Sequence, residues 1–139
     1  MNGYLLDTNV ISEARKGQRA NRHVRAWLDS VGDEALFLSV LVLGEIRRGI
    51  EQIRSTDPAQ AGALERWLNG LEQDYHERIL PITAAIAQQW GRLNAVRPLS
   101  SVDGLLAATA HIHEMTLVTR NVNDIARTGI RALNPFLPS

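Results

Sequence analysis

Hydrophobic and polar positions along the chain follow two patterns: short apolar runs, and longer stretches in which apolar residues recur with helical spacing. The short runs predict strands over residues 3–6, 35–39, 78–82, 115–119 and 130–133. The longer stretches predict helices over residues 8–15, 21–30, 40–53, 58–75, 83–96, 101–113 and 121–127. Because strands and helices alternate, the sequence predicts an α/β fold, a three-layer sandwich in which helices flank a central, mostly parallel sheet of about five strands.

Polar residues mark the starts of several predicted helices. Ser39 is placed to cap the helix that follows the second strand, and Asp57 precedes a proline at a first-turn position, where proline is tolerated. Either Ser100 or Ser101 caps the helix that runs to about His113.

The composition narrows the class of protein. A chain of 139 residues predicts a single domain, residues 1–139, that buries a core of its own. Its 45% apolar and 22% charged residues are ordinary for a soluble globular protein. We expect a cytoplasmic protein without membrane contact, because no apolar run could span a bilayer and the N-terminus lacks a secretory signal. The absence of cysteine excludes disulfides, thiolate zinc sites and a cysteine nucleophile.

Charge gives no general attraction for nucleic acid, since the 15 basic and 15 acidic residues cancel. Any such binding has to come from a local patch. One basic segment is a candidate, and the alternative interpretation is a solvated surface. The segment consists of Arg15, Lys16, Arg19, Arg22, His23 and Arg25.

Carboxylates recur where the predicted strands end. Asp7 directly follows the first strand, and Glu45 lies about two turns into the helix after the second. Asp103 is in the first turn of the helix before the fourth strand, and Asp124 lies just beyond that strand. In a parallel sheet the helices begin at the carboxyl edge of the strands, so we expect all four acids at the edge where open α/β sheets bind ligands.

Each acid also has a simpler structural explanation. Asp7 could cap the helix that it precedes, and Glu45 could pair with Arg48 on the next turn. Capping patterns fit the other two acids, in Ser100-x-x-Asp103 and Asn121-x-x-Asp124.

Small residues beside two of the acids favour a functional interpretation. Gly44 and Gly49 flank Glu45, well past any cap, and each costs on the order of 1 kcal/mol in a helix interior. This predicts a close approach to that helix. Gly104 and the alanines after Asp103 form a small-residue face, predicted to pack near a strand end or a phosphate.

Carboxylates that converge in one cleft repel one another, and the usual remedy is Mg²⁺ or Mn²⁺ bound through oxygen. Such an ion suits phosphodiester chemistry. Other chemistries fit less well: the sequence has no GxxxxGK[ST], GxGxxG or GxSxG motif, and His111 and His113 face apart on one helix. The sequence therefore predicts an acidic, metal-dependent site.

Four segments carry a resemblance: "LLDTNVISE", "LSVLVLGEIRRGI", "SSVDGLLAATA" and "TLVTRNVNDI". In this order they resemble the PIN-domain family, and within it toxins of VapC type and the related FitB proteins. The resemblance runs from Tyr4 to the "ALNPF" near the end. It implies a small α/β sandwich, an acid cluster that binds Mg²⁺ or Mn²⁺, and endoribonuclease activity restrained by a cognate, VapB-like antitoxin.

Carried over by position, the resemblance makes Asp7, Glu45 and Asp103 metal-binding and catalytic residues. The fourth place falls either on Asn121, directly after "TR", or on Asp124 three residues later; we expect Asp124, with Asn121 as a neutral ligand or water-positioning residue. Glu45 either binds metal or takes the proton of the attacking water. The residues expected to orient carboxylates and water are Thr8, Asn9 and Thr119.

The resemblance also implies partners. We expect a homodimer, an antitoxin through which alone operator DNA is bound, and an RNA substrate. The basic segment from Arg15 to Arg25 either guides the RNA backbone or contacts the antitoxin, and the helix from Pro58 to Asp74 is a candidate interface. Two alternatives stay open. One is a non-catalytic partner in a repressor complex, and the other is a haloacid-dehalogenase-like phosphotransferase that uses Asp7.

Overall fold

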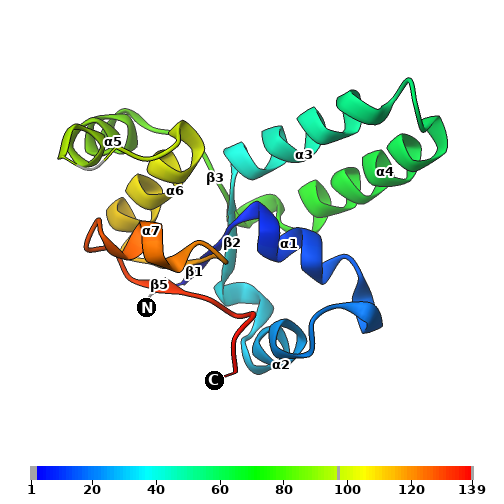
Figure 1. Ribbon diagram of the computed structural model, residues 1–139, viewed down its shortest axis with the longest axis horizontal. Coiled ribbons are helices and arrows are strands. Elements are labelled where there is room, and N and C mark those ends of the chain that lie inside the picture. Colours follow the sequence, from blue (N-terminus) through cyan, green and yellow to red (C-terminus); the bar gives the residue numbers. More distant parts are fainter. Residues whose placement is uncertain (1–2, 97, 139) are drawn as a thin grey trace.

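A computed structural model describes residues 3–96 and 98–138 and contains one five-stranded sheet with helices on both sides (Figure 1). Every strand pair is parallel, and the strand order is β3-β2-β1-β4-β5. This confirms the predicted α/β class. The strands are β1 (Tyr4–Leu6), β2 (Leu36–Ser39), β3 (Ile79–Leu80), β4 (Thr116–Val118) and β5 (Ala132–Leu133).

The helices fall within the predicted ranges, with ends that differ by a few residues. They are α1 (Thr8–Ala14), α2 (Arg22–Ser30), α3 (Val40–Ile53), α4 (Pro58–Asp74), α5 (Ala84–Val96), α6 (Ser101–Ile112) and α7 (Val122–Ala126). Among the described residues there are also three short 3-10 turns, which the sequence did not predict, at Gly17–Arg19, Asp33–Ala35 and His76–Arg78. Within the described ranges, no helix is long and apolar enough to cross a membrane.

The strand order contains a reversal between β1 and β4. From β1 the chain moves outward to β2 and then β3, whereas from β4 it moves the other way to β5. The carboxyl ends of β1 and β4 therefore flank a topological switch point, the usual place for a ligand site in an open parallel sheet. Asp7 follows one of these strands and Thr119 the other.

The central strands are anchored by the core. Leu5 and Leu6 of β1 are fully buried, as are Leu38 of β2 and Val118 of β4. In the register of β1 with β4, Leu6 lies opposite Val118, so the residues that follow them emerge side by side at the sheet edge. The buried apolar run thus determines where the first polar side chains appear.

Most predicted helix caps are present. The Ser39 hydroxyl accepts a 3.0 Å hydrogen bond from the Leu41 N–H, and Asp57 accepts one of 3.1 Å from the Gln60 N–H. Ser100, rather than Ser101, caps α6, because its hydroxyl accepts from the Asp103 N–H at 3.2 Å. These caps fix the starts of the helices that carry Glu45 and Asp103.

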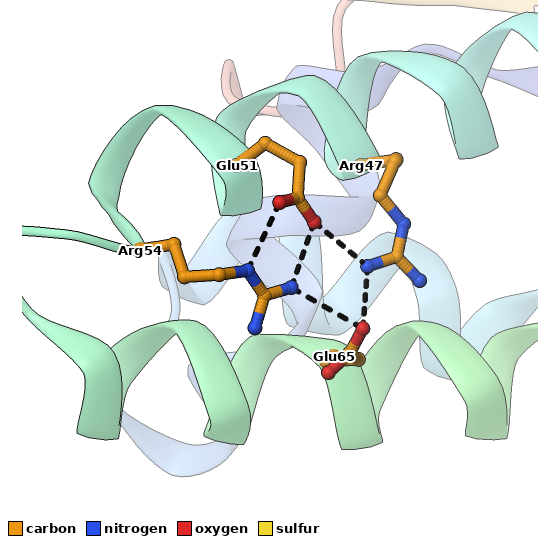
Figure 2. Close-up of polar contacts among 4 residues, drawn as sticks. All are labelled: Arg47, Glu51, Arg54 and Glu65. Atoms are coloured by element: carbon orange, nitrogen blue, oxygen red, sulfur yellow. Dashed lines mark hydrogen bonds and ion pairs between the residues drawn. The ribbon is translucent and has the colours of Figure 1, made fainter.

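Helices α3 and α4 pack as a hairpin that extends away from the sheet (Figure 1). An ion-pair network joins them (Figure 2): Glu51 and Glu65 each contact both Arg47 and Arg54. The shortest pairs are Arg47 to Glu65 at 2.6 Å and Arg54 to Glu51 at 2.7 Å. The network links the helix that carries Glu45 to its neighbour.

The structure tests the glycine predictions only against the chain itself, and it corrects the one for Gly104. A Cβ built at Gly44 or Gly49 would meet nothing within 4 Å among the described residues, so no part of the described chain makes the close approach expected there. At Gly104 the close neighbour is Trp90 of α5, whose ring atoms would lie 2.9 and 3.0 Å from a Cβ. The small residue thus serves the packing of α6 on α5, since an indole and not a phosphate occupies the space.

Candidate active site

Asp7 lies at the junction of β1 and α1. Its N–H donates a 2.9 Å hydrogen bond to the Val118 carbonyl, which continues the pairing of β1 with β4. Its carboxylate accepts a 2.7 Å hydrogen bond from the Thr8 N–H and so caps α1. The residue is only 6% exposed. The capping interpretation of Asp7 is therefore correct, and it leaves this carboxylate buried at the switch point.

Thr119 and Asn9 hold the Asp7 carboxylate from two sides. The hydroxyl of Thr119, which is fully buried, donates a 2.8 Å hydrogen bond to Asp7 Oδ2 and accepts one of 3.1 Å from the Asn121 N–H. The Asn9 amide group donates to the same Oδ2 at 3.4 Å. The Asn9 Oδ1 accepts from the Arg120 N–H at 3.2 Å, so the segments after β1 and β4 are tied together.

Glu45 and Asp103 act on the same carboxylate through their charge. Burial raises the pKa of Asp7, the hydrogen bonds from Thr119 and Thr8 lower it, and the negative charges of Asp103 and Glu45 raise it further. Glu45 is half-buried on α3, and its Oε1 accepts a hydrogen bond from the Thr8 hydroxyl. The structure thus brings three acids from α3, α6 and the end of β1 into one electrostatic environment.

The chemistry of this group fits a hard divalent cation. All the candidate ligand atoms for a metal are carboxylate oxygens. Within the described residues, none of the three acids forms an ion pair with an arginine, lysine or histidine. Like charges around a buried carboxylate without a basic partner favour an added cation. In the described parts of the chain, however, no three acidic or histidine side chains are already arranged to hold one. Binding by all three acids therefore requires their side chains to rotate toward one another.

Asp124 and Asn121 lie at the margin of the group. Asp124 is exposed on α7 and lines a cavity of about 140 Å³ with Leu99 and Arg127. Among the described residues, no hydrogen bond or ion pair joins it to the other acids. Asn121 begins α7 without a side-chain capping bond, so the capping pattern expected for this helix is wrong. Asn121 contributes to the group through its backbone N–H, which donates a hydrogen bond to the Thr119 hydroxyl.

The basic segment is largely engaged in contacts of its own. The Arg15 guanidinium lies 5.6 Å from the centre of the Trp67 ring, and Lys16 pairs with Glu13 at 3.0 Å. Arg25 donates to the Gln18 carbonyl at 3.0 Å. Arg19 and Arg22 are exposed, and so offer their charge to solvent.

One residue next to the acids was missed by sequence reasoning. Arg120 follows Thr119 directly, and its guanidinium lies 3.8 Å from the centre of the Phe136 ring. The sequence did contain a signal for this residue. Arg120 comes directly after the end of the strand that pairs with β1, so it has to lie at the same sheet edge as Asp7.

Comparison with known proteins agrees with the fold. The PIN-domain family model matches residues 4–130. The chain is 31% identical to toxin FitB of Neisseria gonorrhoeae, over 95% of this chain and 97% of that protein. It is 30% identical to VapC ribonuclease Y4jK of Sinorhizobium fredii, over 97% and 99% of the two chains.

Among solved structures, the crystal structure of FitAcB from Neisseria gonorrhoeae superposes with a TM-score of 0.86 at 30% identity, and covers 96% of this chain and 98% of that one. The structure of FitAB bound to IR36 DNA gives a TM-score of 0.88 at 30% identity, over 98% and 97% of the two chains. The family resemblance predicted from the four sequence segments is confirmed, and the chain belongs to the PIN-domain family.

Proposed function

We propose that this protein is the toxin of a type II toxin-antitoxin pair and acts as a metal-dependent endoribonuclease. The names of its relatives support this function, since one is a toxin and another a ribonuclease. The observation that carries it is the buried Asp7 carboxylate at the β1/β4 switch point, under the negative charges of Glu45 and Asp103. Family membership favours this chemistry over an aspartyl phosphotransferase.

Asp7, Glu45 and Asp103 would hold the cation, Mg²⁺ or Mn²⁺. When bound, such an ion polarises a phosphodiester and makes water a better nucleophile. The protein's own part is to hold the Asp7 carboxylate in place through the hydrogen bonds from Thr8 and Thr119, which also oppose the rise in its pKa that burial causes. Thr8 also restrains Glu45 through Oε1, while Glu45 Oε2 accepts no hydrogen bond among the described residues. This free oxygen suits the role of accepting the proton of the attacking water.

Asp124 takes the fourth place as an auxiliary acid. Its cavity is shared with Pro98 and Leu99, the residues that lead into the helix of Asp103, which supports a location on the same sheet edge. Because it contacts none of the three central acids in the described structure, we expect Asp124→Asn to reduce activity less than Asp7→Asn does. Asn121 serves there as a neutral, water-positioning neighbour.

The partners follow from the same relatives. Solved structures with 30% identity include FitAB on DNA, which supports a cognate antitoxin for this chain and contact with operator DNA only through that antitoxin. We further propose a homodimer in the cytoplasm, with α4 as a candidate interface. The same DNA complex favours a second candidate function, a non-catalytic part of a repressor complex. Metal-dependent turnover distinguishes the two.

Cleavage of total cellular RNA by the purified, antitoxin-free protein tests the proposal. We expect discrete fragments in Mg²⁺ or Mn²⁺, and none in EDTA or with Asp7→Asn. Asp57→Asn is the matched control, because Asp57 is also a helix N-cap and its cap to Gln60 survives the change to asparagine. Cleavage that persists in EDTA, or an equal loss in both variants, would contradict the metal-dependent site. Intact RNA with every folded protein would favour the repressor role.

A further inference from the structure

A cavity of about 600 Å³ lies between α2, α7 and the C-terminal segment. Its volume is in the range of pockets that take small organic groups. The wall is mainly apolar, with Trp27 and Leu133 among its residues, and it carries His23 and Asn123 as polar groups. Within the described residues, no aspartate or glutamate lines it, whereas Arg120 does. The cavity therefore favours an uncharged aromatic group attached to an anion.

Arg120 connects this cavity to the acids. Its N–H donates to Asn9 Oδ1 at 3.2 Å, and the amide group of Asn9 donates to Asp7 Oδ2 at 3.4 Å. Only one side chain therefore separates the backbone of Arg120 from the buried carboxylate. A ligand that spans the cavity and the acids would therefore pass residue 120.

The guanidinium of Arg120 is held as a flat platform. It lies 3.8 Å from the centre of the Phe136 ring. Asn134 fixes that arrangement from both sides: its Oδ1 accepts from the Phe136 N–H at 2.9 Å, and its Nδ2 donates to the Arg120 carbonyl at 3.5 Å. Among the described residues Arg120 has no carboxylate within ion-pair distance, although its charge is one of the causes that lower the pKa of Glu13. A ligand would therefore displace no ion pair of Arg120.

We propose that this cavity binds one unpaired base of the RNA substrate, next to the phosphodiester that is cut at the acids. Proteins recognise single-stranded RNA by stacking splayed-out bases on aromatic rings and arginine planes and by hydrogen bonds to the base edges. Arg120, backed by the Phe136 ring, supplies the stacking surface. The side chains of Asn123 and His23, which make no hydrogen bond to described residues, supply edge contacts. The inference rests on the proposed ribonuclease function and assigns base selection to residues outside the acid group.

Binding of short oligoribonucleotides, measured by fluorescence anisotropy in Mg²⁺, tests this inference. The parent protein is the Asp7→Asn variant, which we expect to bind without cutting. The probes are single-stranded oligomers of equal length made of adenosine, cytidine, uridine or abasic ribose units. Phe136→Leu and Arg120→Lys are introduced separately into the parent. The first removes the ring that backs the guanidinium, and the second keeps the charge but loses the guanidinium plane. Arg92→Ala, on α5 and outside the cavity, controls for the loss of a surface arginine.

We expect the parent to prefer one base, and both pocket variants to bind that oligomer on the order of fivefold to a hundredfold more weakly, the range for loss of base stacking. Their affinity for the abasic oligomer should match that of the parent, and Arg92→Ala should change neither. Photo-crosslinking of a thiouridine-containing oligomer gives a second measurement that does not depend on variants. We expect the oligomer to crosslink to residues within the range 120–138.

Three results would overturn the inference. Unchanged RNA affinity in both pocket variants would leave the cavity to a protein partner such as the antitoxin. An equal loss for the base-containing and abasic oligomers would make Arg120 a phosphate contact only. If the parent binds no oligomer at all, the ribonuclease proposal fails together with the pocket. The first two results leave that proposal intact.

Discussion

The Thr119 hydroxyl donates to the Asp7 carboxylate at 2.8 Å, and this bond joins the ends of the two central strands. Both residues are buried, and the parallel register that places Leu6 opposite Val118 makes them neighbours. A hydrogen bond to the ionised form of a carboxylate holds its orientation and opposes the rise in its pKa that burial causes. The apolar core of the sheet thus positions the most buried acid of the site.

Thr119→Val should lower ribonuclease activity by roughly 10- to 100-fold, the usual effect of losing a group that orients a metal ligand. The shape of the side chain is kept, but Asp7 loses a donor and the Asn121 N–H loses its acceptor. Thr119→Ser should retain most activity. Rates of RNA cleavage at a saturating metal concentration measure the effect.

Thr109→Val is a matched control for the Thr119 variant. Thr109 is equally buried, but its hydroxyl donates to the Leu105 carbonyl within α6 and touches none of the acids. Both changes should alter the free energy of unfolding by about 1 kcal/mol. Only Thr119→Val should alter the cleavage rate, and a similar rate loss in Thr109→Val would show that the effect is structural.

Asp7→Asn should raise the free energy of unfolding of the metal-free protein near neutral pH. Burial and the charges of Asp103 and Glu45 raise the pKa of Asp7, so ionising it costs more in the folded chain than in the unfolded one. Its contribution to stability is therefore present at low pH and is lost as pH rises through the folded pKa. Asparagine cannot ionise, so the variant does not lose this stability as pH rises. Its side-chain oxygen can still cap α1.

Thermal unfolding with and without Mg²⁺ measures this effect. In EDTA near neutral pH the variant should melt higher than the wild type, and added Mg²⁺ should raise the melting temperature of the wild type much more than that of the variant. A wild type that melts at the same temperature with and without Mg²⁺ would count against a cation at these acids.

The sequence predicted the sheet edge well, because the pattern there is local. An apolar run that stops at Asp7 marks both the end of β1 and the start of α1, and Ser39 and Ser100 mark the starts of α3 and α6 in the same way. Since parallel strands share one carboxyl edge, these local signals also predict which elements bring the acids together.

Contacts between distant segments were not predictable in this way. The Arg120 contact with Phe136 depends on how the C-terminal segment folds back, and no periodicity encodes it. The start of α7 was predicted incorrectly for a related reason. The Asn121 N–H donates to the Thr119 hydroxyl, and the Asn121 side chain does not cap the helix. Likewise, the helical spacing predicts that Trp90 lies in an apolar stripe, but it does not predict the contact of Trp90 with Gly104.

Gly104→Ala should destabilise the fold by about 1–3 kcal/mol, the usual range for overpacking. The added Cβ would lie 2.9 Å from Trp90 Cδ1, so α6 and α5 would have to separate. Because Asp103 precedes this position on α6, the cleavage rate should fall as well. Urea unfolding together with RNA cleavage measures both effects.

Gly91→Ala provides the opposite expectation within the same helix pair. A Cβ there meets nothing within 4 Å among the described residues, so the alanine should stabilise α5 by up to about 1 kcal/mol through its helix propensity. If both glycine variants shift the free energy of unfolding in the same direction, the close packing of Trp90 on Gly104 is not the reason for the effect of Gly104→Ala.

The ion-pair network between α3 and α4 should make stability depend on pH in the acid range (Figure 2). Hydrogen bonding to Arg54, and less strongly to Arg47, lowers the pKa of Glu51 to about 2 from an ordinary value of 4.5. A lowered pKa contributes stability that is present above the ordinary value and is lost as pH falls through about 2. The groups are exposed, so the effect should be small and should weaken with added salt.

Glu51→Gln isolates this effect, because glutamine keeps the length of the side chain and cannot be ionised. The difference in urea midpoint between wild type and variant should be constant near neutral pH, shrink below pH 4.5 and vanish near pH 2. Glu72→Gln, on α4 and outside the network, should show no such difference. A wild-type advantage that persists at the lowest pH would mean that Glu51 acts by packing, and that its charge does not hold the hairpin of α3 and α4 together.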